Sequence, residues 1–265
     1  MLVELQAKSN LFAGVDEVIN RELGVESYRH KSACLTLLNG SSFDVSGERL
    51  VSEMFNQLQD NWETIAKSSD RLPSAENFRW FEPKIAIADA NKSPEVTLER
   101  ALIKACLQQG RTDWSNQVPI ASGLVNATAY KRRAIDLVRR RGRHSFDLVE
   151  LKVASDTPLY AAMEILLYGM LWLLSRIDRN RLGYANKPII EADSIDFRVL
   201  APRRYYEGVD VRPFARQLDR GVASLGRNRD VDLGFSFKAF SDEFVWPNKY
   251  SASALSNALD RIEAV

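Results

Sequence analysis

The chain has 265 residues, of which 45% are hydrophobic, and its formal net charge is +1. This composition is typical of a globular protein with a sizeable core, and such a charge does not by itself indicate a nucleic-acid partner. With two histidines and two cysteines, the chain has no Cys/His cluster with the spacing of a zinc site. Any bound metal would therefore depend on carboxylates, which favour hard cations such as Mg²⁺ or Mn²⁺.

Several features indicate a cytoplasmic protein without a membrane span. Cys34 and Cys106 lie in apolar runs, as expected for buried thiols in a reducing compartment. A charge at Glu4 argues against a signal peptide. The apolar stretch 159–174, whose single charge is Glu164, is shorter than the ~20 residues that a bilayer requires, so we expect a buried core helix there.

Residues 1–91 are predicted to form an N-terminal α/β extension with an accessory role. Helices are expected at 11–23 and 48–67, and an apolar run occupies 33–38. The polar, proline-containing stretch 89–94 marks the expected boundary.

Residues 92–265 are predicted to form an α/β domain, with a mixed central sheet flanked by helices. Ser93 can cap a helix that begins at Pro94 and ends before Gly110, and Thr157 can cap the apolar helix. The other expected elements are strands at 118–125, 134–139, 146–153, 195–200 and 233–237, and helices at 211–225 and 252–262.

The segment 146–153 carries apolar residues on both of its alternating faces, which is typical of a central strand covered on both sides. Within it, Glu150 and Lys152 are two positions apart and leave the strand on the same face. Burying a carboxylate and an ammonium group is costly unless they are paired or bind a ligand. The two residues therefore indicate either a structural ion pair or a functional site.

A neighbouring acid favours the functional site. The segment 133–138 reads as a second strand with Asp136 in its middle, and a polar turn at 139–144 connects it to 146–153. A hairpin folded about Gly142–Arg143 would bring Asp136 within one residue of facing Glu150, with Cβ atoms ~5 Å apart. Two carboxylates this close repel each other unless a proton or a cation lies between them.

A second Glu-x-Lys triplet, Glu82-Pro83-Lys84, lacks these supporting features. Its central proline is incompatible with a central strand, and no hairpin partner supplies an acid. The surroundings of Glu150 and Lys152, and not the triplet alone, therefore favour an active site.

At these positions the sequence resembles the PD-(D/E)xK nucleases, the restriction-endonuclease-like superfamily. Asp136 matches the first acid, Glu150 the second and Lys152 the lysine. Many members carry a further glutamate on the helix before the first core strand, and Glu99 fits that place, with Glu95 one turn earlier as the alternative. A solvated helix face is the other interpretation of Glu99, but apolar residues at 102, 103 and 106 share its side of the helix.

The resemblance extends into the apolar helix. The RecB-like and phage-exonuclease branches carry Gln-x-x-x-Tyr there, whereas this chain has Glu164 and Tyr168 at the same spacing. A single acid is costly to bury in an apolar helix, and a neighbouring site would explain it. Glu164 and Tyr168 are therefore expected to support the residues that act directly.

The resemblance implies hydrolysis of phosphodiester bonds in nucleic acid, with DNA the favoured substrate. Asp136, Glu150 and the backbone carbonyl of Leu151 would hold Mg²⁺ or Mn²⁺. Lys152 would orient or help to deprotonate the attacking water and offset negative charge in the transition state. Glu99 would act through a metal-bound water or a second ion, and a homodimer would suit the cleavage of both strands.

Basic residues crowd the predicted hairpin and are candidates for contact with the nucleic-acid backbone. A solvated turn is the other interpretation of such a run. The segment 203–206, which combines arginines and tyrosines, is a weaker candidate for contact with single strands. The candidates in the hairpin are Lys131, Arg132, Arg133, Arg139, Arg140, Arg141 and Arg143.

Two other functions are weighed against a nuclease. A catalytically inactive, nuclease-like module for DNA binding or assembly would be expected to have lost an acid or the lysine, and both acids and the lysine are present. A small-molecule enzyme on an α/β sheet would be expected to carry a glycine-rich phosphate loop or a Ser/His/Asp arrangement, and we find neither.

Overall fold

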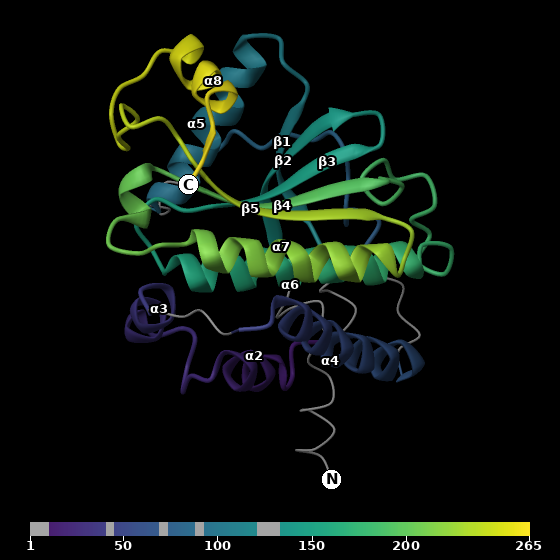
Figure 1. Cartoon of the computed structure of the whole chain (residues 1–265). Helices are drawn as coiled ribbons and strands as arrows, with labels where there is room; N and C mark the ends of the chain where they lie inside the picture. Colours follow the sequence, from purple (N-terminus) through teal and green to yellow (C-terminus); the bar gives the residue numbers. More distant parts are fainter. Residues whose placement is uncertain (1–10, 41–44, 69–73, 88–92, 121–132) are drawn as a thin grey trace.

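The computed structural model describes residues 11–40, 45–68, 74–87, 93–120 and 133–265. Its centre is a six-stranded mixed sheet in the order β1-β2-β3-β4-β5-β6 (Figure 1). The strands β2–β3–β4–β5 form the middle, with β3–β4 and β4–β5 parallel and the remaining pairs antiparallel. The strands are β1 (Trp114–Pro119), β2 (Ala134–Gly142), β3 (Ser145–Leu151), β4 (Ser194–Ala201), β5 (Asp232–Ala239) and β6 (Glu263–Ala264).

Helices cover both faces of the sheet. Helices α5 and α8 lie on one face, α6 and α7 lie on the other, and α2, α3 and α4 form a further layer beyond α6 and α7 (Figure 1). This arrangement confirms the predicted α/β fold with a mixed sheet flanked by helices. The helices are α2 (Val15–Leu23), α3 (Lys31–Leu38), α4 (Gly47–Ser68), α5 (Pro94–Gln108), α6 (Pro158–Ile177), α7 (Arg212–Arg227) and α8 (Ala252–Asp260), with a short 3₁₀ helix, η2 (Arg203–Tyr206).

The two predicted helix starts are observed. The Ser93 hydroxyl accepts a hydrogen bond from the backbone N–H of Val96, and the Thr157 hydroxyl accepts one from that of Tyr160. A proline follows each cap at the first helical position, where its missing N–H costs nothing. These caps fix the starts of α5 and α6, the helices that contain Glu99 and Glu164.

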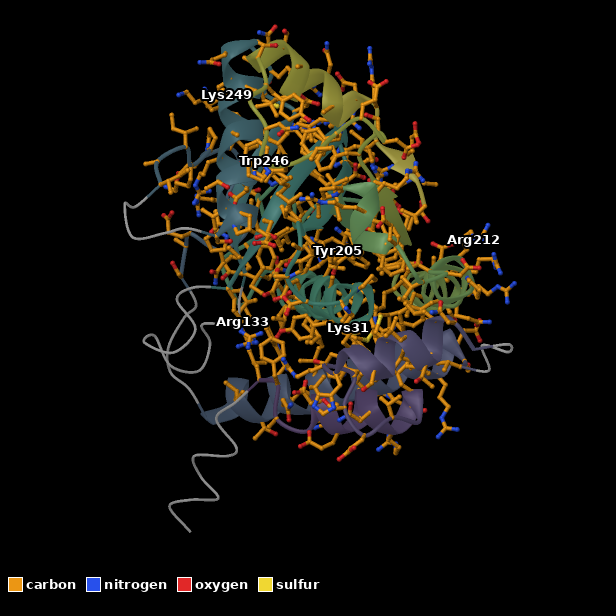
Figure 2. The ribbon with its side chains drawn as sticks, turned by 90° about the vertical axis from the view of Figure 1, so that its left-hand side faces the viewer. Lys31, Arg133, Tyr205, Arg212, Trp246 and Lys249 are labelled. Carbon is orange, nitrogen blue, oxygen red and sulfur yellow. The ribbon has the colours of Figure 1, made fainter. Side chains whose placement is uncertain are left out.

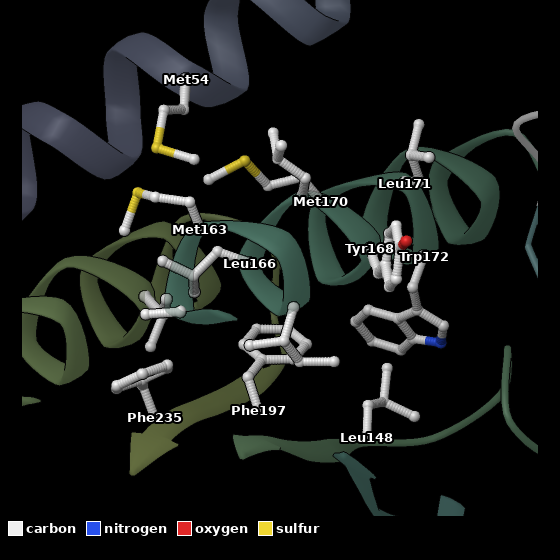
Figure 3. Close-up of a cluster of buried hydrophobic side chains, with 14 of the residues drawn as sticks. Met54, Leu148, Met163, Leu166, Tyr168, Met170, Leu171, Trp172, Phe197 and Phe235 are labelled. Atoms are coloured by element: carbon white, nitrogen blue, oxygen red, sulfur yellow. The ribbon is translucent and has the colours of Figure 1, made fainter. Parts of the chain in front are cut away.

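Helix α6 is the buried core helix expected from its apolar sequence. It is the one helix in the described part of the chain that is long and apolar enough to cross a membrane, and 89% of its apolar window is buried inside the protein. Its side chains pack between Met54 of α4 and the sheet residues Leu148, Phe197 and Phe235 (Figure 3). Gly169 permits this close approach, since a Cβ there would come within 2.3 Å of the Phe197 ring.

The N-terminal region differs from the expected α/β extension, because its described residues contain helices and no strand. The apolar run 33–38 lies inside α3, where Cys34 and Leu38 point into the core. Helix α4 packs against α7 so closely that a Cβ on Gly221 would lie 2.3 Å from the carbonyl oxygen of Gly47. The N-terminal helices consequently share one hydrophobic core with α6 and α7.

The expected strand at 118–125 is displaced toward the N-terminus, since β1 ends at Pro119 and residues 121–125 lie outside the described part.

The basic turn carries a bulge between Arg140 and Gly142, so β2 runs three residues beyond the predicted end at Arg139. The extra residue increases local twist without changing which side chains face each other nearer the middle of the hairpin.

Candidate active site

The observed register brings the two core acids face to face. Leu137 pairs with Val149 and Val138 with Leu148, so the next position along places Asp136 opposite Glu150. This agrees with the register expected from the hairpin. Oδ2 of Asp136 also accepts a hydrogen bond of 3.0 Å from the backbone N–H of Leu151, which fixes the carboxylate at the end of β3.

Lys152 completes the site and bridges several acids. Its ammonium nitrogen lies 2.9 Å from Oε1 of Glu150, 2.9 Å from Oε2 of Glu164 and 3.4 Å from Oδ2 of Asp156. Glu150 and Lys152 are 5% and 6% exposed, so these pairs are largely shielded from water. The sequence left open a structural ion pair or a functional site at Glu150 and Lys152. The structure has features of both, because the ion pair lies inside a cluster of converging acids.

Protonation states follow from this crowding. Burial raises the pKa of Asp136 to about 6, and the nearby charge of Glu164 acts in the same direction. Burial, Asp136 and Glu164 together raise the pKa of Glu150 well above its ordinary value. Burial alone would lower the pKa of Lys152, but Glu150 and Glu164 raise it above its ordinary value. The neighbouring acids thus favour the charged form of Lys152, which suits electrostatic stabilisation better than proton abstraction.

Glu99 approaches the site from α5 and is 1% exposed. Its carboxylate accepts hydrogen bonds from Asn116 and Gln117 of β1, the latter at 2.8 Å, and pairs with Arg100. Burial and the charge of Asp136 raise the pKa of Glu99 to about 8. Glu99 is therefore a buried acid within electrostatic reach of Asp136, and not part of a solvated helix face.

Glu95, the alternative to Glu99, has a different position. Its Oε1 accepts hydrogen bonds from the backbone N–H groups of Val153, Ala154 and Ser155 at 3.2–3.4 Å, and from the Ser155 hydroxyl at 2.8 Å. Burial alone would raise the pKa of Glu95, but these hydrogen bonds and one from Ser93 lower it to about 2. Glu95 thus anchors the loop that follows Lys152.

Glu164 and Tyr168 lie beside the site, where the spacing on α6 places them. The Tyr168 hydroxyl donates a hydrogen bond of 3.0 Å to Oε1 of Glu164, whose other oxygen contacts Lys152. Burial alone would raise the pKa of Glu164, but Lys152 and this network lower it. The two residues therefore hold the lysine in place.

Four contributors were not identified from the sequence. Asn116 and Gln117 bind Glu99, Asp156 contacts Lys152, and the Tyr160 ring centroid lies 5.8 Å from the lysine nitrogen. Asp156 follows Lys152 by four positions, and Tyr160 precedes Glu164 by four. Such spacing was the only available signal, and it is common among residues without any role.

The segment 203–206 lies closer to the site than its weak signal suggested. Tyr205 is half-buried, and desolvation raises its pKa, while the nearby charge of Lys152 acts in the opposite direction. Within the described residues its hydroxyl has no hydrogen-bond partner.

The basic hairpin divides into two parts. Arg133 lines a cavity with Glu164 and Tyr168, whereas Gly142 at the turn is six residues along β2 from Asp136, ~20 Å at the rise of a strand. Arg143 is exposed at this distant turn, and Lys131 and Arg132 lie outside the described residues.

The arginines of β2 have partners within the protein. Arg139 lies 3.7 Å from Asp113, and Arg140 donates to the backbone carbonyls of Gly142 and Arg143. Arg141 pairs at 2.7 Å with the fully buried Asp147. These contacts favour a structural role for the distant part of the hairpin.

Among the described residues, no three Asp, Glu, His or Cys side chains are arranged to hold one metal ion. The donor chemistry nevertheless fits a hard cation, because Asp136 and Glu150 are opposed oxygen donors at the end of a central hairpin. Burial raises the pKa of both acids, and the charge of Asp136 raises that of Glu150 further, so a divalent ion would favour their ionised forms. The two acids and the Leu151 carbonyl, which lie together at the end of β3, are thus suited to binding a divalent ion.

No protein-family model matches the sequence, and no curated protein or solved structure gives a match to the chain.

Proposed function

We propose that the protein is a metal-dependent nuclease that hydrolyses phosphodiester bonds of nucleic acid, with DNA the favoured substrate. The observation that carries the proposal is the meeting of Asp136, Glu150 and Lys152 at one end of the sheet. The half-buried Asp136 and the buried Glu150 face each other beside the Lys152 ammonium group, an arrangement suited to a substrate whose negative charge grows during reaction. A cytoplasmic location would suit this activity and the two buried, unpaired cysteines.

In this proposal Asp136, Glu150 and the Leu151 carbonyl would hold Mg²⁺ or Mn²⁺. The ion would supply Lewis-acid polarisation of the phosphate and a more acidic water. The hydrogen bond from the Leu151 N–H holds Asp136 toward β3, and Glu164 holds the Lys152 ammonium group in place. Lys152 would contact a non-bridging phosphate oxygen and offset its charge, while Glu99 would accept a hydrogen bond from water near Asp136.

The test is a nuclease assay with Mg²⁺ or Mn²⁺ on linear, nicked, single-stranded and branched DNA and on RNA. Asp136→Asn and Lys152→Met preserve side-chain size and are expected to lower the cleavage rate by at least ~100-fold, in the range found when one electrostatic group is removed from an active site. The exposed lysine of the second Glu-x-Lys triplet provides a matched control, since Lys84→Met should leave the rate unchanged.

Activity that survives both active-site substitutions would refute the proposed site. Absence of metal-dependent cleavage on every substrate, with nucleic-acid binding retained, would instead favour the inactive binding module.

A further inference from the structure

Two cavities lie near Lys152, whose own side chain lines neither of them. The first, of about 220 Å³, is lined by Tyr28, Arg29, Arg133, Tyr160 and Glu164 among others. The second, of about 460 Å³, is lined by residues that include Lys31, Asp156, Arg204 and Tyr205.

Lys152 forms an ion pair with one lining residue of each cavity. Its ammonium nitrogen contacts Glu164, which lines the first cavity, and Asp156, which lines the second. A group bound at Lys152 would therefore lie close to both cavities. Each cavity takes one wall from the N-terminal helical layer, through Arg29 just before α3 and through Lys31 at its start.

The first cavity combines arginines with aromatic rings. The Arg29 guanidinium carbon lies 5.2 Å from the ring centroid of Tyr28 and 5.0 Å from that of Tyr160. Asp16 holds the guanidinium at 2.8 Å, and the Tyr160 hydroxyl accepts a further hydrogen bond of 3.2 Å from it. The Tyr28 ring is 1% exposed and stacks on the Tyr160 ring, with the two centroids 5.9 Å apart. The half-buried Tyr160 ring and the Arg29 guanidinium plane are therefore the surfaces available to stack an unpaired base.

The second cavity offers cationic and hydroxyl groups. Lys31 is exposed, and no ion pair to it is found among the described residues. Figure 2 shows Lys31, Tyr205 and Arg133 on the same face of the protein, with Arg133 to the left of Lys31 in this view. Arg204 is exposed, and the buried Tyr205 hydroxyl lacks a hydrogen-bond partner within the described residues. A phosphate oxygen would supply the acceptor that this hydroxyl lacks.

We propose that one nucleic-acid strand crosses the site from the first cavity to the second, with the scissile phosphate at Lys152 and the N-terminal helices as the outer wall. The substrate class would thus be single-stranded, because cavities of this size accept a separate base or sugar-phosphate unit. The bases of a duplex are stacked inside it and cannot enter them. This inference rests on the proposed nuclease function.

The strand path is tested by fluorescence anisotropy with labelled 20-nucleotide DNA and RNA single strands and the corresponding blunt DNA duplex, in EDTA so that metal-dependent cleavage does not interfere. Single strands of either type are expected to bind at least about tenfold more tightly than the duplex. Tyr160→Leu should weaken single-strand binding about tenfold through lost stacking, whereas Tyr160→Phe should retain most of it. Lys31→Ala should weaken binding and reduce its salt dependence.

Lys104→Ala is the matched control, since Lys104 is an exposed helical lysine that lines neither cavity, and it should bind as the wild type does. Circular dichroism establishes that each variant is folded. Equal affinity for single strand and duplex, or unchanged affinity in both Tyr160→Leu and Lys31→Ala, would overturn the proposed path.

A parallel cleavage assay with Mn²⁺ separates this inference from the nuclease proposal. Selective single-strand binding without any cleavage would contradict the nuclease function and leave the strand path standing. Cleavage of duplex DNA that is unaffected by Lys31→Ala and Tyr160→Leu would contradict the strand path and leave the nuclease function standing.

Discussion

The ammonium nitrogen of Lys152 and Oε2 of Glu164 lie 2.9 Å apart, although one residue follows a strand and the other lies in the second turn of α6. The other carboxylate oxygen is bound by Tyr168. One side chain therefore fixes the position of the lysine relative to the apolar helix.

Substitution of Glu164 should change catalysis in a graded way. Glu164→Gln keeps a carbonyl oxygen that can accept from Lys152, so its cleavage rate should fall less than that of Glu164→Leu, for which we expect a loss of ~10–100-fold. Steady-state kinetics of the two variants measure this difference. Equal rates for wild type and Glu164→Leu would show that the contact does not position the lysine.

Divalent metal should stabilise the protein more at high pH than at low pH. Burial raises the pKa of Asp136 to about 6 and that of Glu99 to about 8, so the folded protein retains protons that the unfolded chain has lost. Raised values of this kind contribute stability that is present at low pH and lost as the pH rises through the folded pKa. In the metal-free protein, the stabilisation that these acids add to the melting temperature should therefore decrease as the pH rises from 5.5 to 8.5.

Mg²⁺ or Mn²⁺ competes with those protons, so its effect on the melting temperature should be larger at pH 8.5. Differential scanning fluorimetry with and without EDTA measures both effects. Asp136→Asn serves as the comparison and should respond little to metal. An equal response of wild type and Asp136→Asn would locate metal binding elsewhere.

Loss of the Glu95 carboxylate should loosen the loop after Lys152. Glu95→Ala removes the acceptor of three backbone N–H groups, so amide hydrogen exchange at 153–155 should become faster. Glu95→Gln retains an acceptor oxygen and should protect these amides better. Exchange measured by mass spectrometry tests this, and unchanged rates in Glu95→Ala would mean that other contacts hold the loop.

Two arginines of the β2–β3 hairpin should differ in their effect on stability. Arg141→Ala removes one of two cationic partners of the fully buried Asp147, the other being Arg198 at 2.9 Å. We expect a loss of about 2 kcal/mol in the free energy of unfolding, less than removal of the sole partner of a buried charge would cause. Arg143→Ala changes an exposed residue of the turn and should leave stability unchanged.

Urea unfolding of both variants measures the difference. If Arg143→Ala weakened nucleic-acid binding as strongly as Tyr160→Leu, the distant end of the hairpin would belong to the substrate surface after all.

The core of the site was predictable because its signals are local. The alternation of 146–153, the two-position spacing of Glu150 and Lys152, and the hairpin register depend on strand geometry alone, and the observed pairing agrees with them. The caps at Ser93 and Thr157 are similarly local, so the starts of α5 and α6 were correct.

The remainder depends on contacts between distant segments. The helical character of 33–38 was missed because a short apolar run is compatible with a strand or a helix, and packing decides between them. Arg29 reaches Tyr160 across 131 positions, and no pattern in either segment indicates that contact. The partner of Arg141 is likewise set by the buried Asp147 and not by the basic run itself.

The layered position of α6 has a consequence for how the protein is made. This helix is largely apolar apart from Glu164 and Arg176, and α4 packs on it from the side opposite the sheet (Figure 3). Because α2 to α4 precede α6 in the chain, they leave the ribosome first and are available as a cover when α6 emerges. A chain that begins after α4 would present the helix to solvent, and we would expect it to aggregate or to be captured by chaperones during synthesis.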